Sequence, residues 1–543
     1  MLTGAQLIVE ALAAEGVETA FGLPGVHNLA LWRALGDSGI RLVGVRHEQT
    51  AAYAGDGYAR ASGRLGVGVT TTGPGAANTL AAVGEAWASR QPLLVIATDV
   101  PTSVRRPGVW RGSLHEATDQ AAMFEPVTKG ALRVRSAASL RAAVTEAARL
   151  ALAPPSRPVY LEVPTDLLSA EVEQPARVPP ERAAGEPIAH DRIVAAAERI
   201  EPARRPLVWA GGGALQAGAG AAVAQLAERL VAPVITTYSA RGLLPPGHPC
   251  LVGAPPHVPA VGALWDEADV VIAIGSDFDG PMTQNWKMPQ PPHLVAINVD
   301  AEDAAKAYLP DVTLEADARE ATELVAHRIE PRGGLEALRR RLRELDAGVR
   351  AGLEESDPEA VEFLDAFAAA VPDDTVVVCD MCIPGYWLGA FHRPPAPRKL
   401  AYPLGWGTLG CAFPQALGAA LAGAGPVVSV SGDGGFLYAT GELAAAAQER
   451  IPLTAVIVDD GGYGMLRFDQ DRRGLPREGV DLHTPDFAAL AGSFGIRSFT
   501  VDGLGPNFAA ALTRQIASAE PSVLVAKAAL RPPPNVSPRW YRR

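Results

Sequence analysis

Two carboxylates that each follow an apolar run have the types and spacing to bind a metal ion. Asp433 lies in a Gly-Asp-Gly turn directly after the apolar run 427–430, and Asp460 lies in an Asp-Asp-Gly-Gly turn after the run 453–458. A helical segment at 441–450 separates the two runs. The pattern therefore predicts one right-handed strand–helix–strand unit with an Asp at the carboxyl end of each strand. Ligands of open α/β sheets bind at that edge, so we expect both carboxylates to face one site.

Hard oxygen ligands beside glycine suit Mg²⁺ held against a phosphate. Mg²⁺ takes few ligands from a protein and completes its octahedron with phosphate and water. Glycine lets backbone N–H groups approach a phosphate, and a helix N-terminus adds positive potential. Asp and Gly also form ordinary turns, and either turn alone indicates nothing more. The spaced pair followed by Gly462-Tyr463-Gly464 favours a site for a metal ion and a diphosphate.

Strands and helices must alternate along most of the chain to position these turns. Apolar strands are predicted at 42–45, 66–71, 92–97 and 158–163, with helices between them, and the same alternation returns later in the chain. Apolar strands in a βα repeat predict parallel sheets covered on both faces. We expect three sequential doubly wound α/β domains at residues 1–167, 192–328 and 358–530, joined by linkers at 168–191 and 329–357 and followed by a tail at 531–543.

The composition argues against several classes of function. The chain has 543 residues, of which 48% are hydrophobic and 20% charged, as expected of a globular protein with large cores. Its net charge of −12 disfavours nucleic acid and anionic membranes as partners. No apolar run is long enough to span a bilayer and the N-terminus lacks a basic signal segment, so we expect a cytoplasmic protein. Cys379 and Cys382 form a CxxC motif, but no second Cys/His pair stands at metal spacing, so we expect no special role for them.

The predicted central domain has a glycine turn, Gly211-Gly-Gly213, after a predicted strand at 207–210. Gln216 occupies the position of the third glycine of a dinucleotide motif, and no acidic residue closes the next predicted strand at 234–237. The sequence therefore disfavours a nicotinamide cofactor in this domain.

Four stretches together resemble the family of thiamin diphosphate-dependent decarboxylases and acetolactate synthases. They are the helix that begins Arg-His-Glu48-Gln, the segment Thr72-Gly-Pro-Gly-Ala-Ala-Asn78, the turn Phe21-Gly-Leu-Pro-Gly25, and the Gly-Asp433-Gly turn with its partner at Asp460. The resemblance covers nearly the full chain and departs where Asp459-Asp460 stands in place of the family's usual Asn-Asn. It implies a pyrimidine-binding domain first, a central Rossmann-like domain second and a diphosphate-binding domain last.

The resemblance also implies roles for residues in these stretches. Glu48 would hydrogen-bond the pyrimidine ring of thiamin diphosphate, and Leu409, where many members have Met, would support the bent cofactor. Asp433, Asp460 and the backbone carbonyl of Gly462 would hold Mg²⁺ and the diphosphate. The remaining cofactor contacts that the resemblance implies are Gly25, Gly73, Pro74, Asn78, Gly407, Gly432, Gly434, Gly435, Tyr463 and Gly464.

Three polar residues are candidates for contact with the substrate. His115 stands where acetolactate synthases typically have glutamine, and an imidazole there could relay a proton or bind a carboxylate. Gln120 is its neighbour, and His27 lies on the turn that lines this pocket in relatives. A lone His on a loop is also often solvent-exposed. The basic, aromatic tail at 531–543 fits a lid and a solvated terminus equally well.

The resemblance implies an enzyme that uses thiamin diphosphate and Mg²⁺ to decarboxylate a 2-oxo acid. The enamine would then be protonated to an aldehyde or added to a second carbonyl, as in acetolactate synthase. Alternatives are a thiamin-dependent acyl-CoA lyase or oxidase, and a non-catalytic homologue that has kept the fold. Because the glutamate and the metal site come from different subunits in this family, a homodimer or a dimer of dimers is implied. Only Phe278-Asp279 resembles the flavin region of acetolactate synthases, so FAD is not expected.

Overall fold

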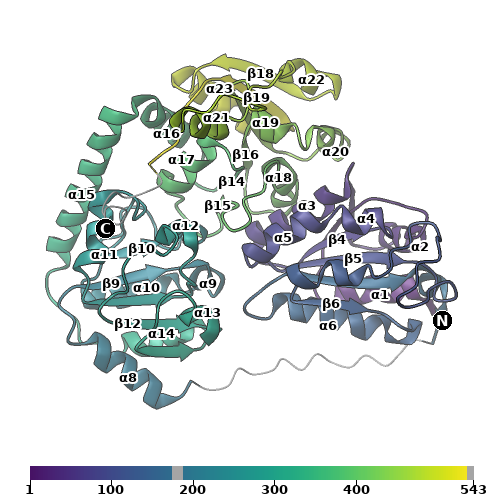
Figure 1. Ribbon diagram of the computed structural model, residues 1–543, viewed down its shortest axis with the longest axis horizontal. Coiled ribbons are helices and arrows are strands. Elements are labelled where there is room, and N and C mark those ends of the chain that lie inside the picture. The colour runs from purple at the N-terminus through teal and green to yellow at the C-terminus, as the bar shows by residue number, and fades with distance from the viewer. Residues whose placement is uncertain (174–187, 535–543) are drawn as a thin grey trace.

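Three parallel β-sheets with helices packed on them make up the computed structural model of the protein (Figure 1). The structure describes residues 1–173 and 188–534, so the middle of the predicted linker and the end of the predicted tail lie outside the described residues. None of the helices in these ranges combines the length and the hydropathy needed to cross a bilayer. The predicted fold class, three sequential α/β units with parallel sheets, is confirmed.

The first sheet comes from the N-terminal part of the chain. Its strands are β2 (Thr19–Gly22), β3 (Arg41–Gly44), β4 (Gly66–Thr70), β5 (Leu93–Asp99), β6 (Gly130–Arg133) and β7 (Val159–Pro164). They stand in the order β3-β2-β4-β5-β7-β6, and every neighbouring pair is parallel. The turn after β3 leads into α3 (Glu48–Ser62), and the turn after β4 leads into the short helix α4 (Pro74–Ala77). The candidate residues of this domain therefore lie at the carboxyl edge of its sheet.

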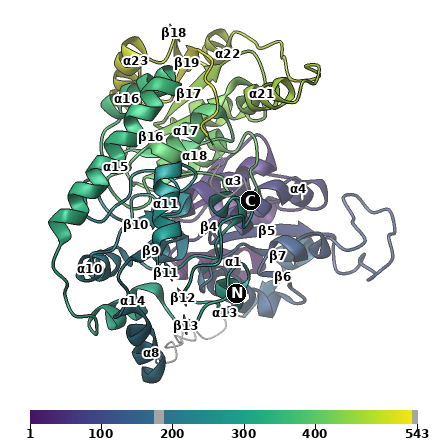
Figure 2. The same ribbon diagram turned by 60° about the vertical axis from the view of Figure 1, so that its left-hand side comes forward.

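The second sheet has five parallel strands in the order β10-β9-β11-β12-β13. They are β9 (Pro206–Ala210), β10 (Val234–Thr236), β11 (Val270–Ile274), β12 (Leu294–Asn298) and β13 (Val312–Glu315). The long helix α15 (Leu335–Ser356) then runs along the outside of the molecule to the C-terminal domain, as both views show (Figure 1, Figure 2).

The third sheet repeats the strand order of the first. Its strands are β14 (Val376–Cys379), β15 (Leu400–Ala401), β16 (Val427–Gly432), β17 (Thr454–Asp459), β18 (Arg497–Asp502) and β19 (Ser522–Lys527). They stand in the order β15-β14-β16-β17-β19-β18, so both sheets read second, first, third, fourth, sixth, fifth along their own part of the chain. Val428 and Val430 pack into one hydrophobic core, whereas Val427 and Ala455 pack into another. Both faces of this sheet are therefore covered, as the sequence predicts.

Several elements differ from the sequence-based expectation. The edge strands β6, β13, β15 and β18 lie outside the predicted set, because edge strands do not need the continuous apolar run that identifies a strand buried on both faces. The inner strand β19 does have such a run, at 523–526, and was also not predicted. The helix predicted at 441–450 begins as a 3₁₀ turn at Thr440–Glu442 and continues as α20 (Leu443–Gln448). The start of the predicted linker forms β8 (Glu171–Val172), which pairs antiparallel with β1 (Leu2–Thr3).

Helix α3 packs closely on α18 (Ala412–Leu421) of the C-terminal domain. A Cβ atom on Gly418 would lie 1.7 Å from the carbonyl oxygen of Ala54, so this close approach requires glycine. The Gln415 side-chain amide also donates a hydrogen bond to Asp56 at 2.6 Å. The helix that begins at Glu48 thus joins the first and third domains of one chain.

Candidate active site

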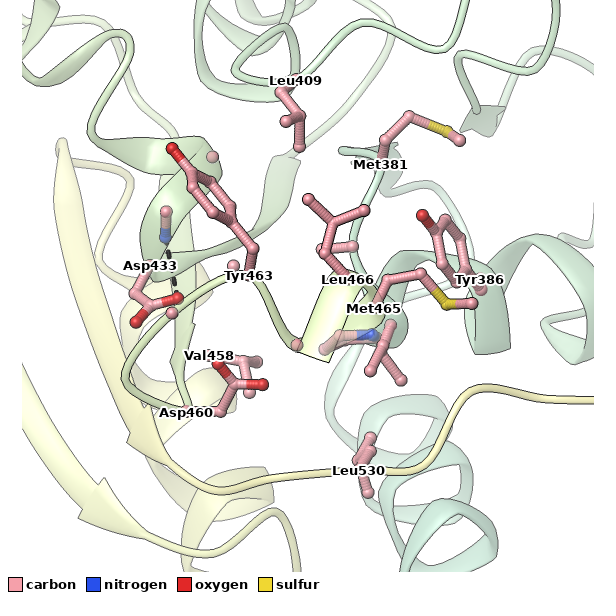
Figure 3. A pocket seen from close by; sticks show the side chains of 18 of the residues that line it. Met381, Tyr386, Leu409, Asp433, Val458, Asp460, Tyr463, Met465, Leu466 and Leu530 are labelled. Atoms are coloured by element: carbon pink, nitrogen blue, oxygen red, sulfur yellow. Dashed lines mark hydrogen bonds between the residues drawn. The ribbon is translucent and has the colours of Figure 1, made fainter. Parts of the chain in front are cut away.

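A cavity of about 210 Å³ opens at the carboxyl edge of the C-terminal sheet, where β16 and β17 end (Figure 3). The parallel pairing of these strands sets Gly432 beside Val458, so the turns that follow lie at one edge. Asp433 and Asp460 both line this cavity. The turns after β16 and β17 therefore present their carboxylates to the same cavity.

Each of these carboxylates has a buried oxygen without a hydrogen-bond partner among the described residues. These atoms are Oδ2 of Asp433 and Oδ1 of Asp460, whereas Oδ1 of Asp433 accepts from the backbone N–H of Gly434 at 2.8 Å. Burial, together with the nearby charges of Asp460 and Asp459, raises the pKa of Asp433 to about 7. A divalent cation would pair with both oxygens and relieve the repulsion between the carboxylates. The oxygen atoms present therefore fit Mg²⁺.

Side chains alone would not complete a metal site at this position. No cluster of three or more His, Cys, Asp and Glu side chains suited to a metal occurs in residues 1–173 and 188–534. Two carboxylates leave most of an Mg²⁺ octahedron to backbone carbonyls, phosphate and water. The glycine-rich walls at 432–435 and 462–464 leave room for such an anion beside the carboxylates.

The other end of the cavity is apolar. It is lined by Met381, Tyr386, Leu409, Met465, Leu466 and Leu530, which face one another across the space in Figure 3. Leu530 directly precedes the predicted tail at 531–543, and the indole N–H of Trp387 donates to the backbone carbonyl of Arg531 at 2.7 Å. The described beginning of the tail is thus fixed along the wall of the cavity, while residues 535–543 lie outside the described part of the chain.

The N-terminal candidates form a second group at the carboxyl edge of the first sheet. Glu48 begins α3, is partly exposed, and accepts a hydrogen bond from the Asn78 amide at 2.9 Å. The Nδ1 atom of His27 lies 2.8 Å from the Thr72 hydroxyl, and the rings of His27 and His115 meet edge to face with centroids 5.4 Å apart. Burial, and then the charge of His115, lowers the pKa of His27, so this imidazole is neutral at pH 7.

Gln120 belongs to the same group but does not face an open space. Its side chain is fully buried, and its Oε1 accepts from the backbone N–H of Gly73 at 2.5 Å. Its Nε2 donates to the carbonyl of Thr98 at 2.9 Å and to the Tyr160 hydroxyl at 2.7 Å. Both ends of this amide are therefore occupied by the protein, and Gln120 holds the turn that contains Gly73.

The two groups of candidates do not meet within one chain. Among the described residues, none of His27, Glu48 and His115 lines the cavity that contains Asp433 and Asp460. The remaining N-terminal candidates, Gly25, Gly73, Pro74, Asn78 and Gln120, lie with Glu48 in the first domain and also do not line it. Each chain therefore carries two separate groups of candidate residues.

Sequence reasoning did not identify two charged residues that lie near these two groups of candidates. The buried carboxylate of Glu442 accepts from the backbone N–H groups of Arg46 and His47 at 3.0 Å, so the C-terminal domain holds the turn before Glu48. Arg467, in the first turn of α21 (Gly464–Arg472), donates to the carbonyl of Asp460 at 3.2 Å. The only sequence signal for Arg467 is a basic residue one helical turn after the second Asp turn.

A further cavity, of about 350 Å³, lies between the first and central domains at the carboxyl ends of β9 and β11. It is lined by the glycine turn at 211–213 and by Asp277 and Asp279. Arg90 donates to Asp277 at 2.9 Å, and Lys306 donates to the same carboxylate at 2.6 Å. An ion pair between the first and central domains, and a second pair within the central domain, thus occupy this edge of the central sheet.

Models of all three domains of one enzyme family match the chain. The N-terminal TPP binding domain of thiamine pyrophosphate enzymes matches residues 2–123, and the central domain matches residues 193–325. The C-terminal TPP binding domain matches residues 382–526, which include the cavity with Asp433 and Asp460. The matches run over most of the chain.

Curated relatives match over nearly the whole chain. A probable 2-ketoarginine decarboxylase of Pseudomonas aeruginosa is 38% identical over 91% of this chain and 88% of its own length. A probable acetolactate synthase large subunit of Methanocaldococcus jannaschii is 30% identical over 92% of this chain and 87% of its own. An acetolactate synthase of Bacillus subtilis is 30% identical over 96% of this chain and 92% of its own.

Proposed function

Because the chain belongs to the thiamine pyrophosphate enzyme family, we propose that its residues hold thiamin diphosphate and Mg²⁺ at a site shared by two copies of the chain. The protein is a thiamin diphosphate-dependent enzyme that acts on a 2-oxo acid, by decarboxylation or by carboligation. The observation that carries the proposed site is the pair of unpartnered carboxylate oxygens, from Asp433 and Asp460, in one glycine-walled cavity.

The residues that line the cavity with Asp433 and Asp460 form the proposed C-terminal half-site, which would hold the diphosphate end of the cofactor. Asp433, Asp460 and the carbonyl of Gly462 would bind Mg²⁺, and the N–H groups of the glycine turns would face the phosphates. Leu409 lines the same cavity, on the side away from the carboxylates, and would contact the middle of the cofactor. Further contacts are proposed for Gly407, Gly432, Gly434, Gly435, Tyr463 and Gly464, all of which line the cavity.

The candidate residues of the first domain, Glu48 among them, form the proposed N-terminal half-site, which would hold the pyrimidine end of the cofactor. When bound, thiamin diphosphate supplies a nucleophilic carbon and an electron sink for the loss of CO₂. Glu48 would share a proton with the pyrimidine ring, held in place by the Asn78 amide. The neutral imidazole of His27 and the adjacent His115 would move a proton at the substrate or bind its carboxylate. Gln120 would act as a positioning residue through the backbone of Gly73.

Two copies of the chain would bring the two half-sites together. Large hydrophobic side chains are exposed in both domains: Leu29 (54%) and Trp110 (66%) in the first, and Tyr438 (60%) and Leu466 (51%) in the third, where Leu466 lines the cavity. Such exposure supports burial against a partner subunit. The proposed minimum assembly is a homodimer with two sites, and a dimer of dimers would bury further surface.

The central domain is not proposed to bind FAD. The sequence resembles the flavin region of acetolactate synthases only at Phe278-Asp279, so FAD is left out of the proposal. A cytoplasmic location also remains a prediction from the sequence.

A 2-oxo acid with a cationic side chain is the proposed substrate class. The 2-ketoarginine decarboxylase at 38% identity supports it, as does Asp469, which lies one turn of α21 beyond the cavity residue Met465. Burial raises the pKa of Tyr386, another residue that lines the cavity, and the negative charge of Asp469 adds to this shift as the smallest of its causes. Asp469 lies beyond the residues that line the cavity and pairs with Arg472 at 3.4 Å, and we propose that a substrate guanidinium would take the place of Arg472.

The enzyme is expected to prefer 2-ketoarginine over the neutral 2-oxo acid of citrulline by about tenfold or more in kcat/KM, because the charged pair is lost with citrulline's urea group. Replacing Asp469 with Asn should remove this preference, whereas Asp471→Asn, on an exposed residue of the same helix, should keep it. The measurement is CO₂ release together with identification of the organic product. Preferential conversion of pyruvate to acetolactate would contradict the cationic substrate and favour carboligation.

Mg²⁺ binding in the presence of thiamin diphosphate is expected to weaken by about tenfold between pH 8 and pH 6. The pKa of Asp433 is raised to about 7, so a proton competes with the metal for this carboxylate below that pH. Calorimetric titration with Mg²⁺ at each pH measures the effect. An equal loss in the Asp433→Asn variant would assign the pH dependence to the diphosphate instead.

A further inference from the structure

We propose that Arg467 is a positioning residue that fixes the turn carrying Asp460 and Gly462 in the shape needed to bind a metal ion. The inference rests on the proposed metal site and adds a residue that would not itself touch the metal. The turn at 460–463 lies between β17 and α21 and lines the cavity with Asp460 and Gly462.

The Arg467 guanidinium bridges the turn and a neighbouring segment. It is 16% exposed, its Nη1 donates to the carbonyl oxygen of Asp460 at 3.2 Å, and its Nε donates to Asp481 Oδ1 at 2.8 Å. The planar fork of arginine can make both bonds at once, which a single ammonium cannot do in the same geometry. The side chain therefore fixes the direction of the Asp460 carbonyl from one side of the turn.

Backbone bonds hold the same segment against the other side of the turn. The N–H of Tyr463 donates to the carbonyl of Val480 at 2.8 Å, and the N–H of Leu482 donates to the carbonyl of Gly461 at 2.9 Å. Gly462 and Asp481 form an isolated antiparallel bridge between them. Arg467 thus joins its own helix, the turn and the segment at 480–482 into one unit.

The fit around Gly462 leaves the guanidinium little freedom. A Cβ atom built on Gly462 would lie 2.7 Å from Nη2 of Arg467 and 2.0 Å from the carbonyl oxygen of Val480. Glycine is therefore needed for the turn to lie between the guanidinium and the segment at 480–482. The backbone of Gly462, proposed as a metal ligand, is held directly against the guanidinium.

The arrangement also leaves the Asp460 carboxylate free for a metal. Nη1 of Arg467 lies 3.9 Å from Asp460 Oδ1, within ion-pair distance but beyond hydrogen-bond distance, and this oxygen has no hydrogen-bond partner among the described residues. The adjacent Asp459 is paired instead with Lys527 at the end of β19. Arg467 therefore donates a hydrogen bond to the backbone of Asp460, while the side chain of Asp460 still lines the cavity.

The test is the affinity for Mg²⁺, measured by calorimetry at a saturating concentration of thiamin diphosphate, in the full-length protein. Replacing Arg467 with Gln is expected to raise the Kd for Mg²⁺ about tenfold. The sign separates positioning from simple electrostatics, because removing a positive charge near a cation site would otherwise strengthen Mg²⁺ binding. Unchanged or tighter Mg²⁺ binding by Arg467→Gln would overturn the proposal.

Four further variants sharpen the result. Arg467→Lys keeps the charge but loses the fork and should bind Mg²⁺ as weakly as Arg467→Gln, and wild-type affinity in this variant would refute positioning. Asp481→Ala removes the acceptor of the Nε bond and should weaken Mg²⁺ binding more than Asp481→Asn, which loses the same charge but keeps an oxygen acceptor, so this pair tests the proposal even if Arg467 variants do not fold. Arg472→Gln, on an exposed arginine of the same helix, is the matched control and should bind like the wild type.

The proposed function and this inference fail in different ways. If the wild-type protein shows no Mg²⁺-dependent binding of thiamin diphosphate, the metal site itself is wrong. If the wild-type protein binds both and Arg467→Gln binds them equally well, only the role of Arg467 is wrong.

Discussion

Replacing Glu48 with Gln is expected to lower kcat by about 100-fold or more while thiamin diphosphate still binds. The glutamine amide keeps the size of the side chain and a hydrogen bond to Asn78, but it cannot share a proton with the pyrimidine ring. Binding would depend mainly on the proposed diphosphate half-site, which this substitution leaves unchanged. Steady-state kinetics and a titration with thiamin diphosphate measure the two effects separately.

A matched control distinguishes this role from the ordinary effect of an acid at a helix start. Glu336 also lies in the first turn of a helix, α15, and is exposed far from both half-sites. Its replacement with Gln removes the same favourable interaction with the helix dipole and should leave kcat unchanged. Wild-type turnover in Glu48→Gln would refute the proposed mechanism.

Co-expression of two inactive variants, Glu48→Gln and Asp433→Ala, is expected to restore about a quarter of the wild-type activity. Half of the dimers in a random mixture would be mixed, and each mixed dimer would contain one site with an intact Glu48 and an intact Asp433. Recovery is expected because the first domain of one chain and the third domain of its partner would form each site. Each variant alone should show only background activity.

The control places both substitutions on one chain. A mixed dimer of the doubly substituted chain with the wild-type chain should have no intact site, because each of its two sites would receive one altered half. If each site were formed within one chain, the result would be reversed: the mixed single variants would stay inactive and the wild-type half of the control dimer would work. Separately tagged chains allow the mixed dimers to be purified and compared directly.

Most strands of the sheets, and the meeting of Asp433 and Asp460 at one sheet edge, could be predicted from the sequence because both depend on local patterns. Buried parallel strands have continuous apolar runs, and strands joined by one helix must pair with their carboxyl ends together. That rule brings Asp433 and Asp460 to one edge without knowledge of any distant contact. Edge strands such as β18, which is half exposed, lack the apolar run and were not predicted.

Contacts between turns could not be predicted in this way. Glu442 and Arg46 are almost 400 positions apart and meet only because α3 packs on α18. Arg467 and Asp481 meet because the segment after α21 folds back along the turn at 460–463. Gln120 has the polarity of a catalytic residue in the sequence, and only its complete burial and its bonds to backbone atoms show that it holds a turn. Periodicity and turn propensity contain no information on such pairings.

The identical strand order of the first and third sheets bears on the ancestry of the molecule. In each sheet the third strand, β4 or β16, ends in a glycine turn and a helix of one turn, α4 (Pro74–Ala77) or α19 (Asp433–Phe436). Duplication of one ancestral domain, followed by divergence, would produce this correspondence. The short helix of the third domain begins with Asp433, where that of the first domain begins with Pro74. A cofactor with two chemically different ends would then have been shared between two copies of what was once a single binding domain.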